Sequence, residues 1–503
     1  MSQAVPQAPP LREARPNPAN AAIPLMALPL VMALLFVVHL VSGIRGADVQ
    51  ILGAALLLGI VCMVPMLAQR LLPQERRHVL ISLFSLTYLV YFGLPAFTQY
   101  LWYREYSEVR IHLVNVAPED ILVGQFTALL GILCVLAGYM LPFGAWVSNA
   151  LPKPRYEWSH GTALAVAIVM LPLGWAIFLG GQFGLVPKRA GSGVLGAIAS
   201  SIYFGVALLG IIYMKYKSRP AVLIMLLLIP PMMLFSFFTG IKRLFLSPLI
   251  MIALSYIVME RRIRPAFIIG GFAVIVVLYP MAQFYREFVQ VSTQVRSVEV
   301  LSDPARVMSL MSAFASQINV AEYIQTGIQS TGTRLDVLGI VSVIVRDTPD
   351  RVPFQGGWTI LNVFLSFIPR LLWPGKPDIT FGQWVTDHYV GPSTSSTGSS
   401  WVGEFYFNFG FPGVIIGMLV VGMYFRALHN TFFVSGATIP ALLASVVILW
   451  TTCPAIEMNL IAPFSGLWFA LAPIFLAHIM VRVLSGPQKR QRRPAHQWGG
   501  PPS

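Results

Sequence analysis

Long apolar stretches separated by short polar loops make up most of the chain. A helix needs about 20 apolar residues to cross the roughly 30 Å hydrocarbon core of a bilayer, and the stretches approach or exceed that length. The pattern therefore predicts an all-α polytopic membrane protein with about twelve transmembrane helices. We expect them at 23–44, 50–69, 79–98, 121–142, 161–181, 194–214, 221–239, 244–259, 265–284, 410–428, 431–450 and 461–481.

One long interruption divides the predicted helices into two groups. The polar region 285–409 is expected to form a large external loop. It separates a nine-helix transmembrane bundle at 23–284 from a three-helix bundle at 410–482. The ends, 1–22 and 483–503, are expected to be cytoplasmic tails, the first disordered and the second basic.

The basic residues predict which side of the membrane each loop faces. With the N-terminus inside, the inner loops hold more than half of the 34 Lys and Arg residues and few of the 20 acidic residues. Cytoplasmic loops carry such an excess of Lys and Arg. An even number of helices, with both termini cytoplasmic, keeps this bias along the whole chain and turns 285–409 outward.

Composition supports a membrane protein and argues against other classes. The chain is 56% hydrophobic and only 11% charged, whereas soluble domains are about 25% charged. The net charge of +14 does not indicate a nucleic-acid partner, because the basic residues form short clusters between apolar runs. Cys62, Cys134 and Cys453 do not form a close pair, which argues against a disulfide framework or a thiolate metal site.

The external loop is expected to contain helices that do not cross the membrane. Asp303 and Pro304 are typical of a helix start, and apolar residues then recur at helical spacing up to Ile328, which predicts an amphipathic helix. The apolar segments 337–345 and 358–368 are too short to span and are expected to be interfacial or re-entrant pieces. The Gly/Ser/Thr-rich tract 391–400 fits either a flexible lid or a spacer.

Several basic residues are candidates for binding an anion at the outer surface. Lys242 and Arg243 follow a predicted outer helix end, where a snorkelling anchor is the alternative interpretation. Arg334, Arg370 and Lys376 lie in the external loop, where pairing with nearby acids in a solvated loop is the alternative. Arg370 lies among prolines, which restrict the backbone, and a guanidinium held rigidly there suits bidentate binding of a pyrophosphate.

Two polar residues interrupt an aromatic stretch just before the tenth predicted helix. Glu404 and Asn408 are four residues apart, so in a helix they share one face. Trp401 and Tyr406 belong to the surrounding stretch. Aromatic rings pack on the C–H faces of sugars, while a carboxylate and an amide bind hydroxyl groups. An interfacial aromatic belt is the alternative, but a carboxylate inside such a belt requires a partner.

At these positions the chain resembles the Wzy-type oligosaccharide repeat-unit polymerases, the O-antigen polymerase family. The resemblance covers roughly residues 239–425, and the helix number and the late external loop also agree with it. It rests on the Thr-Gly-Ile-Lys-Arg sequence of 239–243, Arg-Leu-Asp of 334–336, the Ile-Pro-Arg and Trp-Pro-Gly-Lys-Pro pieces of 368–377, and Gly-Glu through Asn-Phe-Gly of 403–410 with Gly413.

The resemblance implies a membrane glycosyltransferase with a GT-C-like fold, which transfers a glycan from undecaprenyl pyrophosphate onto a lipid-linked repeat unit. The reaction would occur at the periplasmic face of a bacterial inner membrane, without a metal or other cofactor. A chain-length regulator and a flippase are the partners that it implies. An O-antigen ligase-like transferase and a polysaccharide or lipid transporter remain alternatives.

Each candidate residue has an expected role in this chemistry. A pyrophosphate leaving group requires cations, and preorganised charge is often the largest catalytic term. A general base would accept the proton of the acceptor hydroxyl, and side chains near it would orient the sugars. The expected bases are Glu404 and Asp336, the expected pyrophosphate ligands are Arg243, Arg334, Arg370, Lys242 and Lys376, and the expected sugar-binding residues are Asn408, Trp401 and Tyr406.

Overall fold

The computed structural model describes most of residues 47–273 and 335–484. Isolated positions are described between 274 and 334. Shorter gaps fall at 107–108, 112–113, 155, 183–184, 186–191, 239–241, 272, 369–372, 374–380, 392–395 and 435. The predicted tails, the predicted span 23–44, most of the span 265–284 and the amphipathic helix predicted from Asp303 lie outside the described residues.

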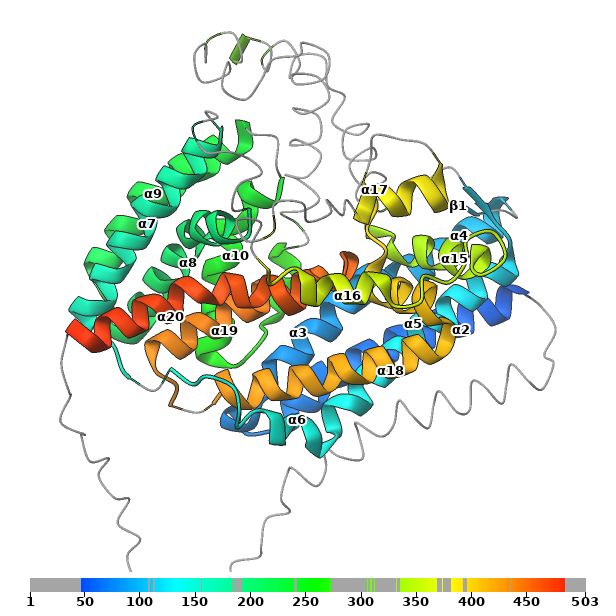
Figure 1. The fold of residues 1–503 in the computed structure, drawn as a ribbon, viewed down its shortest axis with the longest axis horizontal. Helices are drawn as coiled ribbons and strands as arrows, with labels where there is room; N and C mark the ends of the chain where they lie inside the picture. The colour runs from blue at the N-terminus through cyan, green and yellow to red at the C-terminus, as the bar shows by residue number, and fades with distance from the viewer. Residues whose placement is uncertain are drawn as a thin grey trace, which may run out of the picture.

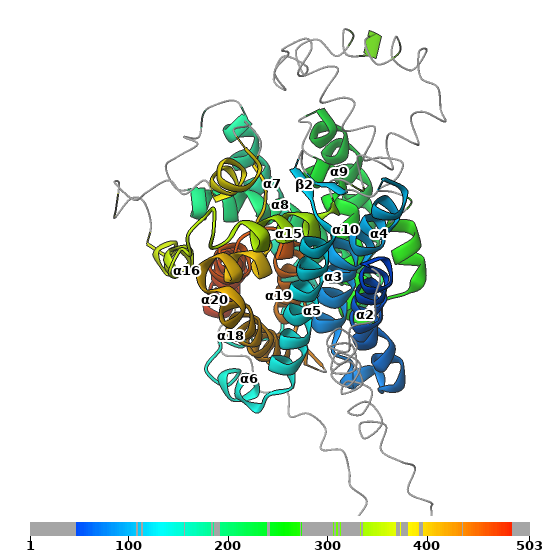
Figure 2. The same ribbon diagram turned by 90° about the vertical axis from the view of Figure 1, so that its right-hand side faces the viewer.

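The described part is built from long apolar helices in two groups (Figure 1, Figure 2). The first group packs around α5 and α18. It contains α2 (Ala47–Ala68), α3 (Val79–Tyr88), α4 (Leu94–Tyr106), α5 (Pro118–Met140), the short α6 (Pro142–Val147) and α18 (Ser400–Phe432). A π-helical turn, Leu89–Gly93, joins α3 to α4 so that the two form one candidate span, Val79–Glu105.

The second group packs around α8. The last two helices of the chain, α19 and α20, return to this group and contact α8, so the early and late parts of the sequence form one structure (Figure 1). The members are α7 (His160–Gln182), α8 (Ser192–Tyr216), α9 (Arg219–Phe238), α10 (Lys242–Glu260), α19 (Ile439–Thr452) and α20 (Leu467–Leu484).

Small residues bring α5 and α18 into backbone contact. A Cβ atom on Gly138 would lie 2.1 Å from the carbonyl oxygen of Leu419, and one on Gly422 would lie 2.1 Å from that of Val135. No side chain fits at such distances, so glycine is required at both positions. Close backbone approach through small residues is typical of helix packing in a membrane, because burial of apolar surface provides little driving force for helix association there.

The described part of the external loop contains short helices that pack on the bundle. Helix α15 (Val337–Asp347) is buried at every residue except Arg346 and lies against α5 and α18. Helices α16 (Trp358–Leu365) and α17 (Phe381–Val385) follow, and a π-helical turn, Thr386–Val390, extends α17. An antiparallel hairpin of β1 (Val109–Ile111) and β2 (Val114–Val116) joins α4 to α5.

The helix pattern predicted from the sequence is largely confirmed where the structure describes it. Nine helices within the described residues are long and apolar enough to cross a membrane, and each overlaps a predicted span. A tenth, Phe245–Glu260, is apolar but shorter. The chain is therefore an all-α membrane protein apart from its one described hairpin. Helix α18 begins at Ser400, before the predicted boundary at 410, so the aromatic stretch belongs to this helix rather than to the loop.

Candidate functional site

A kink in α18 separates the segment that carries Glu404 and Asn408 from the rest of the helix. Gly410 adopts φ 66° and ψ −153°, inside an otherwise helical run. Pro412 lacks an N–H group, so it cannot donate to the carbonyl of Asn408, four residues earlier. The kink therefore leaves backbone acceptors of this segment without helical partners.

Residues just before α16 bind these acceptors. The N–H group of Gln355 donates to the carbonyl of Phe407 at 2.9 Å, and that of Gly356 donates to the carbonyl of Asn408 at 3.3 Å. Gly356 and Gly357 have φ values of +58° and +87°, a region that glycine adopts readily. The two glycines thus allow the chain to turn against α18 and to start α16 beside it.

Glu404 is a fully buried carboxylate with one bonded oxygen and one without a partner. Its exposed fraction is 0%. Oε2 accepts a hydrogen bond of 2.8 Å from the backbone N–H of Leu460, in the turn between α19 and α20. The Thr359 side chain lies near the carboxylate, and Oε1 makes no hydrogen bond to the described residues. A buried carboxylate with a free oxygen is suited to accepting a proton or a hydroxyl hydrogen bond.

Asn408 connects the carboxylate segment to α16. Its Nδ2 donates to Thr359 Oγ1 at 2.6 Å and to the Glu404 carbonyl at 2.7 Å, while its Oδ1 accepts from the Gly357 N–H at 2.9 Å. Because the Thr359 oxygen accepts from Asn408, its own proton is available for Glu404 Oε1. Asn408, Thr359 and Glu404 thus form a buried polar cluster, and Glu404 and Asn408 share one helix face as predicted.

An apolar groove lies directly against this polar cluster. It has a volume of about 540 Å³ and opens to the outside of the bundle between α16, α18 and the turn before α20. Its wall includes the direct neighbours of the cluster, namely Ile360 after Thr359, Phe405 after Glu404, and Leu460 itself. The remaining lining residues are Val363, Phe364, Phe409, Pro412, Gly413, Ile416, Gly417, Val420 and Phe464.

The two aromatic residues predicted to bind sugars are mostly enclosed. Trp401 has an exposed fraction of 0% and stacks on Phe84 of α3, with the ring centroids 5.7 Å apart. Tyr406 is 7% exposed and meets Phe411 edge-to-face at 5.2 Å. In this conformation both rings pack against the protein itself, and their sugar-binding role stays a prediction.

Asp336 occupies a different position from Glu404. It caps α15, accepting from the Gly339 N–H at 2.8 Å and from Gln99 Nε2 of α4 at 3.0 Å. Burial raises the pKa of Asp336 to about 6, although both hydrogen bonds act in the opposite direction. No described hydrogen bond joins Asp336 to Glu404, so the two candidate bases belong to separate environments.

All five predicted pyrophosphate ligands have side chains that the structure does not describe. Arg334, Arg370 and Lys376 lie outside the described residues. Lys242 and Arg243 begin α10, whose backbone is described there while their side chains are not. Their proposed role is therefore still a prediction from the sequence.

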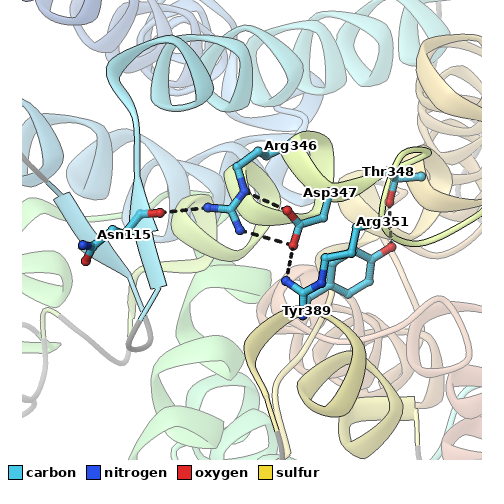
Figure 3. A network of polar contacts seen from close by, with 6 residues as sticks. All are labelled: Asn115, Arg346, Asp347, Thr348, Arg351 and Tyr389. Carbon is cyan, nitrogen blue, oxygen red and sulfur yellow. Dashed lines mark hydrogen bonds and ion pairs between the residues drawn. The ribbon is translucent and has the colours of Figure 1, made fainter.

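The described bases of the external loop pair with acid, in agreement with the alternative interpretation of neutralising pairs. Asp347, only 6% exposed, accepts from Arg346 at 2.7 Å and from Arg351 at 2.9 Å (Figure 3). Arg346 also donates to the carbonyl of Asn115 in the β-hairpin at 2.8 Å. The pKa of Arg346 is raised, mainly by its hydrogen bonds to Asp347. This network fastens α15 to the hairpin.

The Gly/Ser/Thr-rich tract is held in place at its second half. The Thr397 N–H donates to the Gly382 carbonyl and to Thr386 Oγ1, both at 3.0 Å. A Cβ atom on Gly398 would lie 2.0 Å from the carbonyl oxygen of Glu457, so this backbone packs tightly. Residues 392–395 lie outside the described residues, and the described half connects α17 to the start of α18.

Three parts of this site could not be recognised from the sequence. Thr359 is one hydroxyl inside an apolar segment, and only its position after the glycines Gly356 and Gly357 sets it apart. The Leu460 N–H cannot be recognised from residue type, because every residue except proline has one. The groove likewise depends on three segments that are distant in sequence.

The fold and the site define a polytopic helical membrane protein with a buried carboxylate beside an open apolar groove. Among the described residues, no three His, Cys, Asp or Glu side chains come together in a way that could hold a metal ion. The chain belongs to a family described as a domain of unknown function, DUF8712, whose model matches residues 121–432. That match contains α15, α16 and all of α18. No curated protein and no solved structure matches the chain.

Proposed function

We propose that this protein polymerises undecaprenyl-pyrophosphate-linked oligosaccharide repeat units at the periplasmic face of a bacterial inner membrane. The observation that carries the proposal is the contact between the buried Glu404 carboxylate and the wall of an open apolar groove. A glycosyl transfer between lipid-linked substrates requires a polar reaction centre next to a surface that accepts an isoprenoid chain.

The groove fits a lipid chain in length and character. Its α18 residues run from Phe405 to Val420, on both sides of the kink at Gly410. The part after the kink, from Pro412, alone spans roughly 12 Å at 1.5 Å per residue, close to the roughly 15 Å thickness of one leaflet's hydrocarbon. Phe364 and Ile416, two of its lining residues, are 66% and 64% exposed. A chain lying there would cover apolar surface and would bring its head group toward Glu404.

The proposed roles follow from the chemistry of the leaving group and the acceptor. Glu404 accepts the proton of the attacking hydroxyl through its free oxygen Oε1, and the Leu460 N–H holds the carboxylate through Oε2. Arg370, Arg334 and Arg243, assisted by Lys242 and Lys376, neutralise the pyrophosphate as it leaves. Asn408 and the aromatic residues near it orient the sugars, and Asp336 is the second candidate base.

Deletion of the gene distinguishes this function from the alternatives. Loss of a polymerase leaves single repeat units on the lipid carrier or on the cell surface. Loss of all surface glycan would instead indicate a ligase-like transferase or a transporter and would contradict the proposal.

A substitution that fills the groove tests the lipid site directly. Ile416→Trp places a larger side chain in the groove and is expected to lower polymerisation of a lipid-linked repeat unit in a purified system. Leu476→Trp is the matched control, because Leu476 is similarly exposed, at 61%, and does not line the groove. Equal activity of the two variants would remove the groove from the reaction.

A further inference from the structure

The end of the bundle opposite Glu404 contains a second polar group of residues, the Arg426 cluster, made of Arg426, Tyr139, His78 and His429. The Arg426 guanidinium lies over the Tyr139 ring, 5.3 Å from its centroid. Arg426 Nη1 lies 3.4 Å from His78 Nδ1, and the Tyr139 hydroxyl lies 2.9 Å from the same nitrogen. The rings of His78 and His429 are 4.5 Å apart.

The Arg426 cluster carries positive charge, and Arg426 forms no salt bridge with a described acid, although Glu75 acts on the neighbouring Arg261. A guanidinium can only donate hydrogen bonds, so His78 Nδ1 accepts and the His78 ring is neutral. The pKa of His78 is lowered to about 4, first by burial and then by Arg426 and Arg261. Within the described residues neither arginine forms a salt bridge, and Arg261 donates to the carbonyls of Glu75 and Phe433 instead.

The cluster is built into the fold and is only partly closed. His429 is 7% exposed, and its Nδ1 makes no hydrogen bond to the described residues. The Arg426 side chain itself is half-buried. A partly exposed guanidinium without a described counter-charge is suited to binding an anion from outside the chain.

A short helix next to Arg426 has the character of a membrane interface. A Cβ atom on Gly144 of α6 would lie 2.7 Å from Arg426 Cβ, so α6 lies directly against α18 at this residue (Figure 2). Phe143 and Trp146 of α6 are 53% and 70% exposed. Exposed aromatic side chains at a helix-bundle end are typical of the head-group region of a bilayer.

We propose that the Arg426 cluster binds the phosphate of an anionic phospholipid from the leaflet next to the basic loops. The guanidinium grips the phosphate oxygens, and Phe143 and Trp146 contact the acyl and glycerol region. The lipid-linked substrate of the proposed reaction is not the occupant, because the uninterrupted part of α18 between the two sites, from Pro412 to Arg426, alone spans roughly 21 Å at 1.5 Å per residue. That distance exceeds the roughly 15 Å hydrocarbon thickness of one leaflet.

Thermal unfolding of the full chain in nanodiscs measures this binding. Phosphatidylglycerol is titrated into phosphatidylcholine, and the wild-type protein is expected to become more stable in a saturable way. Arg426→Gln is expected to raise the half-saturating lipid fraction about fivefold, because an arginine near an anionic surface contributes roughly 1 kcal/mol of binding free energy. Arg76→Gln, an exposed arginine in the loop before α3, is the control and is expected to resemble wild type.

Further outcomes of this experiment can contradict the proposal. Equal shifts in Arg426→Gln and Arg76→Gln would indicate general charge attraction without a site. Equal stabilisation by inorganic phosphate in pure phosphatidylcholine would assign the site to a free ion. Arg426→Lys keeps the charge and loses the fork geometry, so if Arg426→Gln does not fold, a weaker lipid response in Arg426→Lys supports the site and an unchanged response contradicts it.

Discussion

Replacement of Glu404 by glutamine tests the central residue of the site with a small structural change. The glutamine oxygen can still accept from the Leu460 N–H, now 2.8 Å from Glu404 Oε2. Its amide group would take the place of Oε1 and face Thr359. The nearby Thr359 oxygen already accepts from Asn408 at 2.6 Å, so the new amide would be a buried donor without a ready acceptor.

The two possible roles of Glu404 predict effects of different size. One buried donor left without an acceptor costs about 1–3 kcal/mol of folding free energy, so the variant should still fold. Loss of a general base lowers the rate by about 10²–10⁴-fold. If Glu404 is only structural, this folding cost is the whole effect, and the rate per folded molecule stays near that of the wild type.

The assay therefore combines rate and folded yield. Purified Glu404→Gln is incubated with a lipid-linked repeat unit, products are separated by chain length, and folded protein is quantified by size-exclusion chromatography and thermal unfolding. We expect near-normal yield and no polymer beyond background. Wild-type polymerisation by a well-folded Glu404→Gln protein would refute the catalytic role and would leave Asp336 as the candidate base.

Three further predictions concern residues around this centre. Thr359→Val removes the hydroxyl between Asn408 and Glu404 and should lower the polymerisation rate about tenfold or more, whereas Thr359→Ser should restore it; equal rates would show that the hydroxyl is dispensable. The raised pKa of Asp336 means that the fold favours its protonated form, so thermal stability should fall as pH rises from about 4 through about 6. Asp336→Asn keeps an N-cap acceptor, so it should abolish that fall and raise the free energy of unfolding by up to about 3 kcal/mol at pH 8. An unchanged pH profile of the unfolding midpoint would contradict this. Arg370→Lys keeps the charge but not the fork geometry, so polymer measured in cells should drop strongly at normal protein level, and full polymer with Arg370→Ala would exclude Arg370 from the site.

The sequence by itself determined the class of protein and most of its helices. Apolar length has a direct physical meaning in a bilayer, because a helix must satisfy its own backbone hydrogen bonds across a fixed thickness. The pattern therefore located the candidate spans without knowledge of their packing. The four-residue spacing of Glu404 and Asn408 was likewise sufficient to place both on one helix face, because α-helical geometry is local.

Only the tertiary structure decided what surrounds that face. The acceptor of Asn408 is Thr359 of α16, the donor to Glu404 is the backbone of Leu460, and the groove joins α16, α18 and the turn before α20. Residue type does not reveal such contacts, because they depend on where distant segments meet. The kink at Gly410 with Pro412 and the close approach at Gly138 and Gly422 bring them together, and both depend on backbone shape rather than on the hydrophobic pattern.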